Sequence, residues 1–249
     1  MEEKKRPVQL SDMIASGKKY SLRLTEVIHA LPMDEYCCGQ GAASDGTYAY
    51  FVLRTRQDGY ARIAKYVLAT GEFVAASEPV YVLHGNDMTY CRSKNVLYLI
   101  HGSKEGKIVT TMNPETLTVI EQTVNLPAGA GAMSYSWEKD KFVFSQGGKS
   151  FYVADTDFNL EVSAARTPTP GYTAQGVGSD DTFVYFPMSG PEDNIFMTYD
   201  WQGNYVTDVH IPSPVESESM YWINDTYYIN FNNHSTGAYL CRLDVIPEE

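Results

Sequence analysis

The sequence predicts an all-β fold in which five four-stranded units close into a single ring. Residues 40–51 (QGAASDGTYAYF) align without a gap to residues 175–186 (QGVGSDDTFVYF), so one repeat occurs at least twice. Equivalent units begin 44, 45, 46 and 41 residues apart, at Gln40, His84, Gly129, Gln175 and Glu216. That spacing is typical of a four-stranded blade. Because the apolar runs are only about 4 to 6 residues long and rich in Tyr, Phe, Val and Ile, a helical array is disfavoured. The prediction is a five-bladed β-propeller.

Each unit carries the signals of two hairpins. Two short strands open the unit, as in residues 216–221 followed by 227–231. A second pair is joined by clusters of Gly, Asn, Asp and Pro, at residues 69–72, 113–116, 155–159 and 200–204. Such clusters between β-branched or aromatic runs mark tight turns. Asp45 and Asp180 recur after the innermost strand, and we expect both to act in turns.

The last unit ends near residues 240–243, one strand short of a complete blade. The missing strand lies at the other end of the chain, because residues 25–32 precede the first unit as residues 207–212 precede the fifth. We expect the N-terminal strand to pair with the last blade, which closes the ring and removes an aggregation-prone edge. The only helix is expected near Leu10–Ser16. The chain then divides into a leader, residues 1–20, and a propeller, residues 21–249.

Composition narrows the classes of partner. A formal charge of -12 repels phosphate backbones and anionic lipid, so neither nucleic acid nor a membrane is expected. The charged first 24 residues do not form a signal peptide, and no uncharged apolar run approaches the roughly 18 residues that cross a bilayer. We therefore expect a cytoplasmic protein with reduced cysteines. Gly-rich phosphate loops and metal-binding motifs are missing, so no cofactor and no metal are predicted. A cation held by His84, Asp87 and Glu216 is the geometrically conceivable alternative.

Polar residues gather at one end of the predicted channel, where all five innermost strands begin. The inner group consists of Gln40, His84, Asn86, Asp87, Gln175, Glu216 and Glu218. The surrounding loops add Arg54, Arg56, His101, Gln146, Asp193, Asn233 and His234. Glycines at positions 41, 85 and 176 are expected to keep this entrance open. Because functional side chains are commonly mounted at strand ends of a rigid scaffold, this mouth is the predicted site.

Two residues are predicted to carry any catalysis. Other units have Gln, Gly or Glu where the second has His84, so the repeat does not require an imidazole there, and His84 is the candidate base. Glu216 is the candidate general acid, because burial beside Asp87 would raise its pKa. Of Glu216 and Glu218, only Glu216 is expected to point squarely into the channel. Gln40 and Gln175 occupy identical repeat positions, so capping backbone groups is at least as good an interpretation as ligand contact.

By repeat count and length, residues 24–246 resemble the five-bladed propellers, a group that includes sugar-binding lectins and certain glycosidases. The segment His84-Gly85-Asn86-Asp87-Met88-Thr89-Tyr90 also resembles one seen in uncharacterised bacterial propellers. The resemblance implies the fold and no single activity. Three hypotheses follow: a binder of a polar small molecule or sugar, a hydrolase or lyase that uses the same pocket, and a protein-interaction scaffold. Oligomeric state cannot be predicted.

Overall fold

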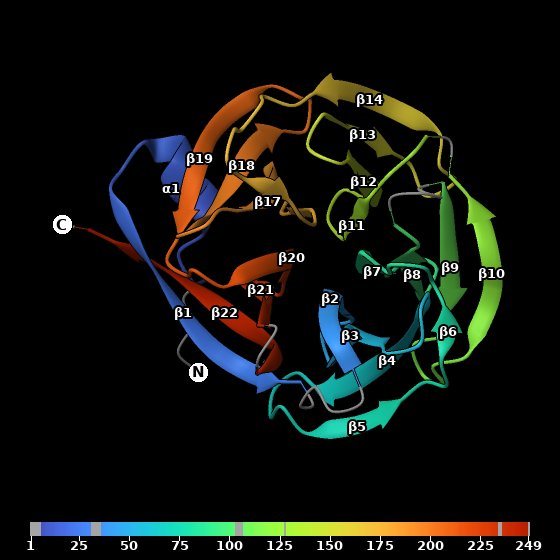
Figure 1. Cartoon of the computed structure of the whole chain (residues 1–249). Helices are drawn as coiled ribbons and strands as arrows, with labels where there is room; N and C mark the ends of the chain where they lie inside the picture. Colours follow the sequence, from blue (N-terminus) through green and yellow to red (C-terminus); the bar gives the residue numbers. More distant parts are fainter. Residues whose placement is uncertain (1–5, 31–35, 103–106, 127, 234–235, 249) are drawn as a thin grey trace.

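The computed structural model describes residues 6–30, 36–102, 107–126, 128–233 and 236–248. Its strands form five antiparallel sheets, which stand as blades around a central channel (Figure 1). This arrangement confirms the predicted five-bladed propeller. Of the predicted site residues, His234 lies outside the described residues.

Each blade is numbered here in chain order, with its strands given from the channel outward. Blade one contains β2 (Tyr36–Ser44), β3 (Tyr48–Thr55), β4 (Tyr60–Val67) and β5 (Phe73–Ala76), with β6 (Val80–Tyr81) also paired to β4. Blade two contains β7 (Asp87–Cys91), β8 (Val96–Ile100), β9 (Ile108–Met112) and β10 (Val119–Asn125). Blade three contains β11 (Ala132–Ser136), β12 (Lys141–Gln146), β13 (Ser150–Ala154) and β14 (Leu160–Ala165). Blade four contains β15 (Thr173–Ala174) and β16 (Gly178–Ser179), then β17 (Phe183–Ser189), β18 (Asn194–Asp200) and β19 (Tyr205–Ile211). Blade five contains β20 (Glu216–Ile223), β21 (Thr226–Asn233), β22 (Gly237–Pro247) and β1 (Tyr20–His29).

The N-terminal strand closes the ring as predicted. β1 is antiparallel to β22, with a register that runs from Tyr20 opposite Pro247 to His29 opposite Tyr239. The two ends of the chain therefore share one sheet (Figure 1). The helix α1 (Leu10–Ser16) precedes β1 where a helix was predicted, and its Leu10 and Met13 pack into the interface between blades four and five.

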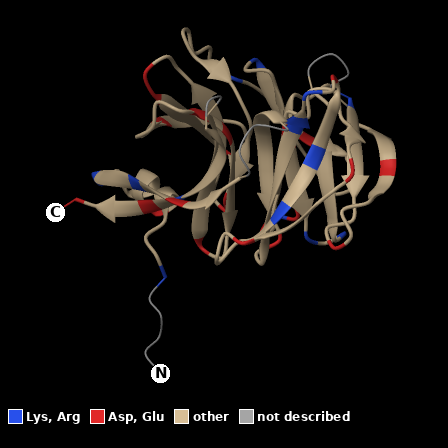
Figure 2. Ribbon diagram, turned by 60° about the horizontal axis from the view of Figure 1, so that its bottom comes forward, with Lys and Arg blue, Asp and Glu red and all other residues tan. Residues whose placement is uncertain are grey.

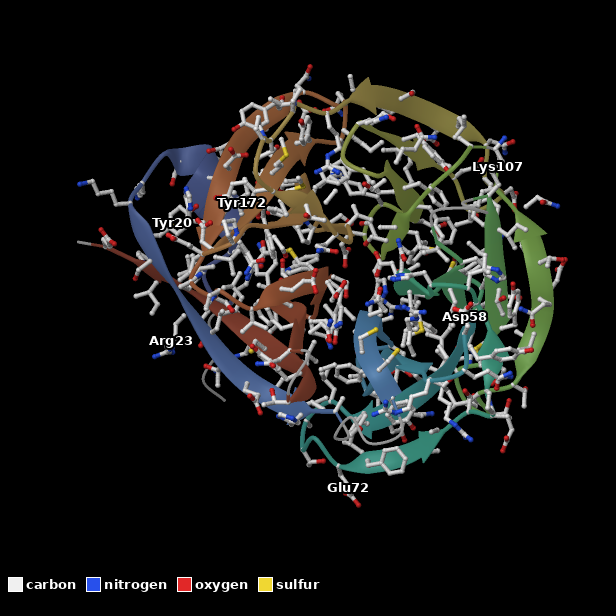
Figure 3. All side chains as sticks on the ribbon, in the orientation of Figure 1. Tyr20, Arg23, Asp58, Glu72, Lys107 and Tyr172 are labelled. Atoms are coloured by element: carbon white, nitrogen blue, oxygen red, sulfur yellow. The ribbon has the colours of Figure 1, made fainter. Side chains whose placement is uncertain are left out.

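Apolar side chains hold neighbouring blades together. Among the described residues, five clusters of buried apolar side chains occupy the five interfaces between blades. Adjacent positions of one strand serve opposite interfaces: Tyr50 of β3 faces blade two, whereas Phe51 faces blade five. This follows from the period-two alternation of side chains along a strand. Burial of each aromatic ring contributes roughly 1.5–3 kcal/mol to the free energy of folding. The side chains fill the spaces between the blades, while Arg23 and Glu72 lie at the outer rim (Figure 3).

The repeated aspartates close turns and bind tyrosines. Asp180 accepts hydrogen bonds from the backbone N–H groups of Thr182 and Phe183, and from the hydroxyls of Tyr185 at 2.7 Å and Tyr227 at 2.6 Å. Asp45 makes the equivalent turn in blade one and also accepts the hydroxyl of a tyrosine five residues later, Tyr50, at 2.6 Å. The predicted turn role of Asp45 and Asp180 is confirmed.

The innermost strands approach one another closely around the channel. A Cβ atom at Gly41 would lie 2.4 Å from the Cα of Asp87, and one at Gly176 would lie 2.2 Å from the carbonyl oxygen of Glu218. These glycines thus permit close strand contact. The expectation that they keep the entrance open is wrong for Gly41 and Gly176, because the room that their missing side chains leave is already filled.

Charged residues are interspersed along the loops and outer strands (Figure 2). Within the described ranges, no helix is long and apolar enough to cross a membrane.

Candidate functional site

The channel has two mouths. The upper mouth is the end where the innermost strands begin, near Gln40, His84, Gln175 and Glu216. The lower mouth is the end where they finish, near Tyr90, Trp137 and Trp222. The sequence predicts the functional site at the upper mouth.

A pair of carboxyl groups lies at the start of β20. Glu216 is half-buried, and its Oε1 accepts a hydrogen bond from Nε2 of Gln175 at 2.6 Å, so blades four and five are joined across the mouth. Glu218 is 4% exposed and hydrogen-bonds to Glu216 and to Asn232. Burial, followed by the charges of Glu216 and Asp87, raises the pKa of Glu218 well above its usual value.

The structure differs here from the expectation that only Glu216 points into the channel. Ser217 pairs with Phe231 and Ser219 pairs with Asn230, so Glu218 is an additional residue in β20. A bulge of this kind re-aims side chains locally. Both carboxyl groups therefore reach the same polar cluster, and Glu218, whose pKa is raised, is the more deeply buried of the two.

His84 and Arg54 stand on two other blades beside this pair. His84 is exposed just before β7, and its pKa is lowered by partial desolvation and by the charge of Arg54, against opposing contributions from Asn86 and Glu216. Its imidazole therefore favours the neutral form, which carries one donor and one acceptor. Arg54 is the penultimate residue of β3, and its side chain is 19% exposed with Nη2 4.0 Å from Asp58 Oδ1. Its buried Nε makes no hydrogen bond within the part of the chain that the structure describes.

Asp87 is placed inside the ring, below the accessible mouth. It is fully buried, and its carboxyl group accepts hydrogen bonds from the backbone N–H groups of Met88 at 2.9 Å, Met133 at 3.2 Å and Val177. These donors belong to or adjoin the innermost strands of blades two, three and four. Burial outweighs the three N–H donors, and the pKa of Asp87 is raised well above its usual value. Its role in the structure is a cross-link between blades.

Other predicted residues are engaged within their own blades. Gln40 is 6% exposed, and its Nε2 donates to the Gly39 carbonyl at 2.9 Å. His101 is 2% exposed with Nε2 2.7 Å from the Thr110 hydroxyl, while its carbonyl accepts the backbone N–H of His84 at 3.0 Å. His101 is therefore buried, and its carbonyl group fixes the backbone at His84. Asn86 is half-buried and hydrogen-bonds to His84.

Three of the outer predicted residues have hydrogen-bond partners within their own blades. Asn233 Oδ1 accepts the backbone N–H of Thr236 at 3.2 Å in the turn after β21. Asp193 accepts a hydrogen bond from the Tyr172 hydroxyl at 2.7 Å, and its Oδ2 lies 3.1 Å from Nδ1 of His210. Gln146 accepts the Ser150 hydroxyl at 2.6 Å, and Arg56 is exposed. In the described part of the chain, no three His, Cys, Asp or Glu side chains are arranged to hold a metal ion.

Sequence reasoning gave Asn232 no role, although it contacts both glutamates. Its Nδ2 lies 3.5 Å from Glu216 Oε2, and its Oδ1 accepts the Gly39 N–H at 3.2 Å. Asn232 is on the second strand of blade five, directly opposite Glu216. Cross-strand position was the signal that could have found it.

Comparison with known proteins supports the fold. No protein-family model and no curated protein matches the sequence. Among solved structures, the chain is similar to glutaminyl cyclase of Myxococcus xanthus, with a TM-score of 0.61 and 15% identity over 92% of this chain and 99% of that one. It is also similar to the PQQ-bound aldose sugar dehydrogenase of Streptomyces coelicolor, with a TM-score of 0.58 and 11% identity over 92% and 99% of the two chains. A chain of a nidogen–laminin complex gives a TM-score of 0.51 at 7% identity over 86% of each chain. These likenesses show the propeller fold alone.

Proposed function

We propose that the upper mouth binds a polar, hydroxyl-rich small molecule such as a sugar or sugar acid. The observation that carries this proposal is the meeting of Arg54, His84 and the Gln175–Glu216 pair, which come from four different blades. His84 and Glu216 start equivalent units and yet differ chemically. A single asymmetric site is therefore favoured over a set of repeated sites.

The chemistry of these groups suits a ligand with both hydroxyl and acceptor groups. Arg54 offers guanidinium donors, and its Nε lacks a hydrogen bond within the described residues. Neutral His84 can donate and accept, and the Glu216 carboxylate accepts hydroxyl protons. A sugar hydroxyl can use all three, and the carboxylate of a sugar acid would pair with Arg54.

An acid–base enzyme in the same mouth is the second candidate, and the carboxyl pair favours it. Glu218, whose pKa is raised, is hydrogen-bonded to Glu216, while the pKa of His84 is lowered. We infer that Glu218 holds a proton that Glu216 can pass toward a leaving group, with neutral His84 as the base. Such separated pKa values are typical of general acid–base pairs in hydrolases and lyases. Two of the similar structures, glutaminyl cyclase and the sugar dehydrogenase, are enzymes.

A thermal-shift screen over sugars, sugar acids and metabolites tests binding. A ligand at about 100 times its Kd should stabilise the protein by about 2.7 kcal/mol. His84→Gln uses the residue that blades one and four already carry, so it should leave the ligand-free melting temperature unchanged and reduce the ligand-induced shift sharply. His29→Gln, an exposed histidine on β1, is the matched control.

Glu216→Gln separates catalysis from recognition. The change keeps the shape and removes a charge, so an enzyme should lose rate whereas a binder of neutral sugars should keep much of its affinity. If both variants bound an identified ligand as well as the unaltered protein does, with turnover also unchanged, the upper mouth would not be the site.

A further inference from the structure

The lower mouth holds a cavity whose lining shares no residue with the polar cluster of the upper mouth. A cavity of about 230 Å³ is lined there by Arg92, Trp137, Glu138, Trp222, Asn224 and Asp225. These residues belong to blades two, three and five, so the cavity lies across the channel axis. An adjoining space of about 10 Å³ shares Trp137 and Trp222 and reaches Tyr135 and Tyr221. That space has room for roughly one water molecule, so a ligand would be confined to the outer cavity.

Both indole rings of the cavity are held by their neighbours. Nε1 of Trp222 donates to Oε1 of Gln9 at 2.8 Å, and Gln9 is itself 1% exposed. Tyr90 packs edge-on against Trp137, with ring centroids 6.0 Å apart and planes at 65°. Both tryptophans remain half-buried, so part of each ring is accessible. Aromatic surface that is already ordered before binding lowers the entropic cost of association.

The charges of the cavity nearly balance. The Arg92 guanidinium lies 5.0 Å from the Trp137 ring centroid, and within the described ranges it makes no ion pair. Glu138 is exposed and likewise has no ion pair among those residues. The Asp225 carboxylate is paired with Nε of Arg6 at 2.8 Å. Arg92 and Glu138, which have no ion pair within the described part of the chain, therefore face the cavity beside the two indoles.

We propose that the lower mouth binds a neutral pyranose ring. The C–H faces of a pyranose pack on indole, and its hydroxyls can accept from Arg92 and donate to Glu138. A charged ligand would place a like charge beside either Arg92 or Glu138. Pockets for drug-sized ligands have volumes of roughly 300–1,000 Å³, so a cavity of about 230 Å³ suits one sugar ring. The inference is independent of the function proposed for the upper mouth.

Tryptophan fluorescence provides a direct test. The chain has three tryptophans, and the third, Trp201, is 9% exposed in the interface between blades three and four. The methyl glycosides of glucose, galactose, mannose and N-acetylglucosamine are titrated to about ten times a Kd of 1 mM. At least one should change the emission saturably and protect it from acrylamide quenching. N-acetyltyrosine amide serves as a non-sugar aromatic probe and should give neither effect.

Two variants assign the signal to this cavity. Arg92→Ala should weaken the responding glycoside about tenfold, because a hydrogen bond from a charged donor is lost. Arg23→Ala, an exposed arginine on the outer rim (Figure 3), should leave its Kd unchanged. Trp137→Ala should abolish the response, with the melting temperature as a check on folding. The proposal is overturned if no glycoside gives a saturable change, if only N-acetyltyrosine amide does, or if Arg92→Ala binds the glycoside as the unaltered protein does.

Discussion

The substitution Glu218→Gln tests whether the buried acid of the upper mouth is protonated in the folded protein. Glu218 is 4% exposed, and burial together with the charges of Glu216 and Asp87 raises its pKa well above the usual value of 4.5. Glutamine has nearly the same shape and can still donate a hydrogen bond to Glu216. The substitution replaces a group that titrates by one that does not, so the difference in pH dependence between the two proteins reports the Glu218 proton.

The sign of the pH dependence follows from linkage. A carboxyl group whose pKa is raised by folding binds its proton more tightly in the folded than in the unfolded chain. The folded protein therefore loses relative stability as pH rises from the unfolded pKa toward the raised folded one. Between these two pKa values, one such group contributes a slope of about 1.4 kcal/mol per pH unit. Unaltered protein should lose this stability toward neutral pH, and Glu218→Gln should not.

Urea unfolding at several pH values from about 5 to about 8 measures the effect. The difference in free energy of unfolding between variant and unaltered protein should shift in favour of the variant as pH rises. Asp87 also has a raised pKa, but it is present in both proteins and its contribution largely cancels. Glu138→Gln is the matched control, because it makes the same chemical change at an exposed position. Parallel stability curves for the unaltered protein and Glu218→Gln would refute a protonated Glu218.

Three further changes test the fold. Asp180 is 1% exposed and accepts four hydrogen bonds, so Asp180→Ala should lower the free energy of unfolding by about 4 kcal/mol, measured by chemical denaturation. Asp45 is half-buried, so Asp45→Ala should cost about half as much, and equal losses for the two variants would contradict this reasoning. Deleting residues 1–30 uncovers the edge of β22 and should produce aggregates on size exclusion, so a monomeric product with unchanged melting would argue against the closure role of β1. Gly41→Ala should lower the free energy of unfolding by about 2 kcal/mol or more, because the new Cβ would lie 2.4 Å from a backbone atom. In the same assay Gly131→Ala should be tolerated, because its new Cβ would meet no atom nearer than 3.8 Å.

The upper mouth shows how far sequence reasoning about the site could go. The repeat alignment identified His84 as a departure from the other units and Glu216 as its counterpart in the fifth, and the charges of Arg54 and Glu216 both act on His84 in the structure. Their roles as ligand contacts, like the predicted cytoplasmic location, stay predictions. Alignment could not predict the bulge that brings Glu218 to Glu216, because bulges depend on the pairing of β20 with β21.

The sequence by itself determined the number of blades, the closing strand and the turn aspartates. These features depend on local chemistry that recurs along the chain: turn residues, period-two apolar alternation and a spacing near 44 residues. Asp45 and Asp180 bind backbone groups only two and three residues away, so their function can be seen in a short segment.

Only the tertiary structure decided which polar groups share a cavity and which are consumed inside the ring. Asp87 was predicted at the mouth, but its carboxyl group binds backbone N–H groups of blades three and four, which are distant in sequence. The lower mouth brings together Arg92, Trp137 and Trp222 from three separate blades, and no local pattern links them. The physical reason is that contacts around a channel are made between strands far apart in the chain, and their geometry follows from strand register and blade packing.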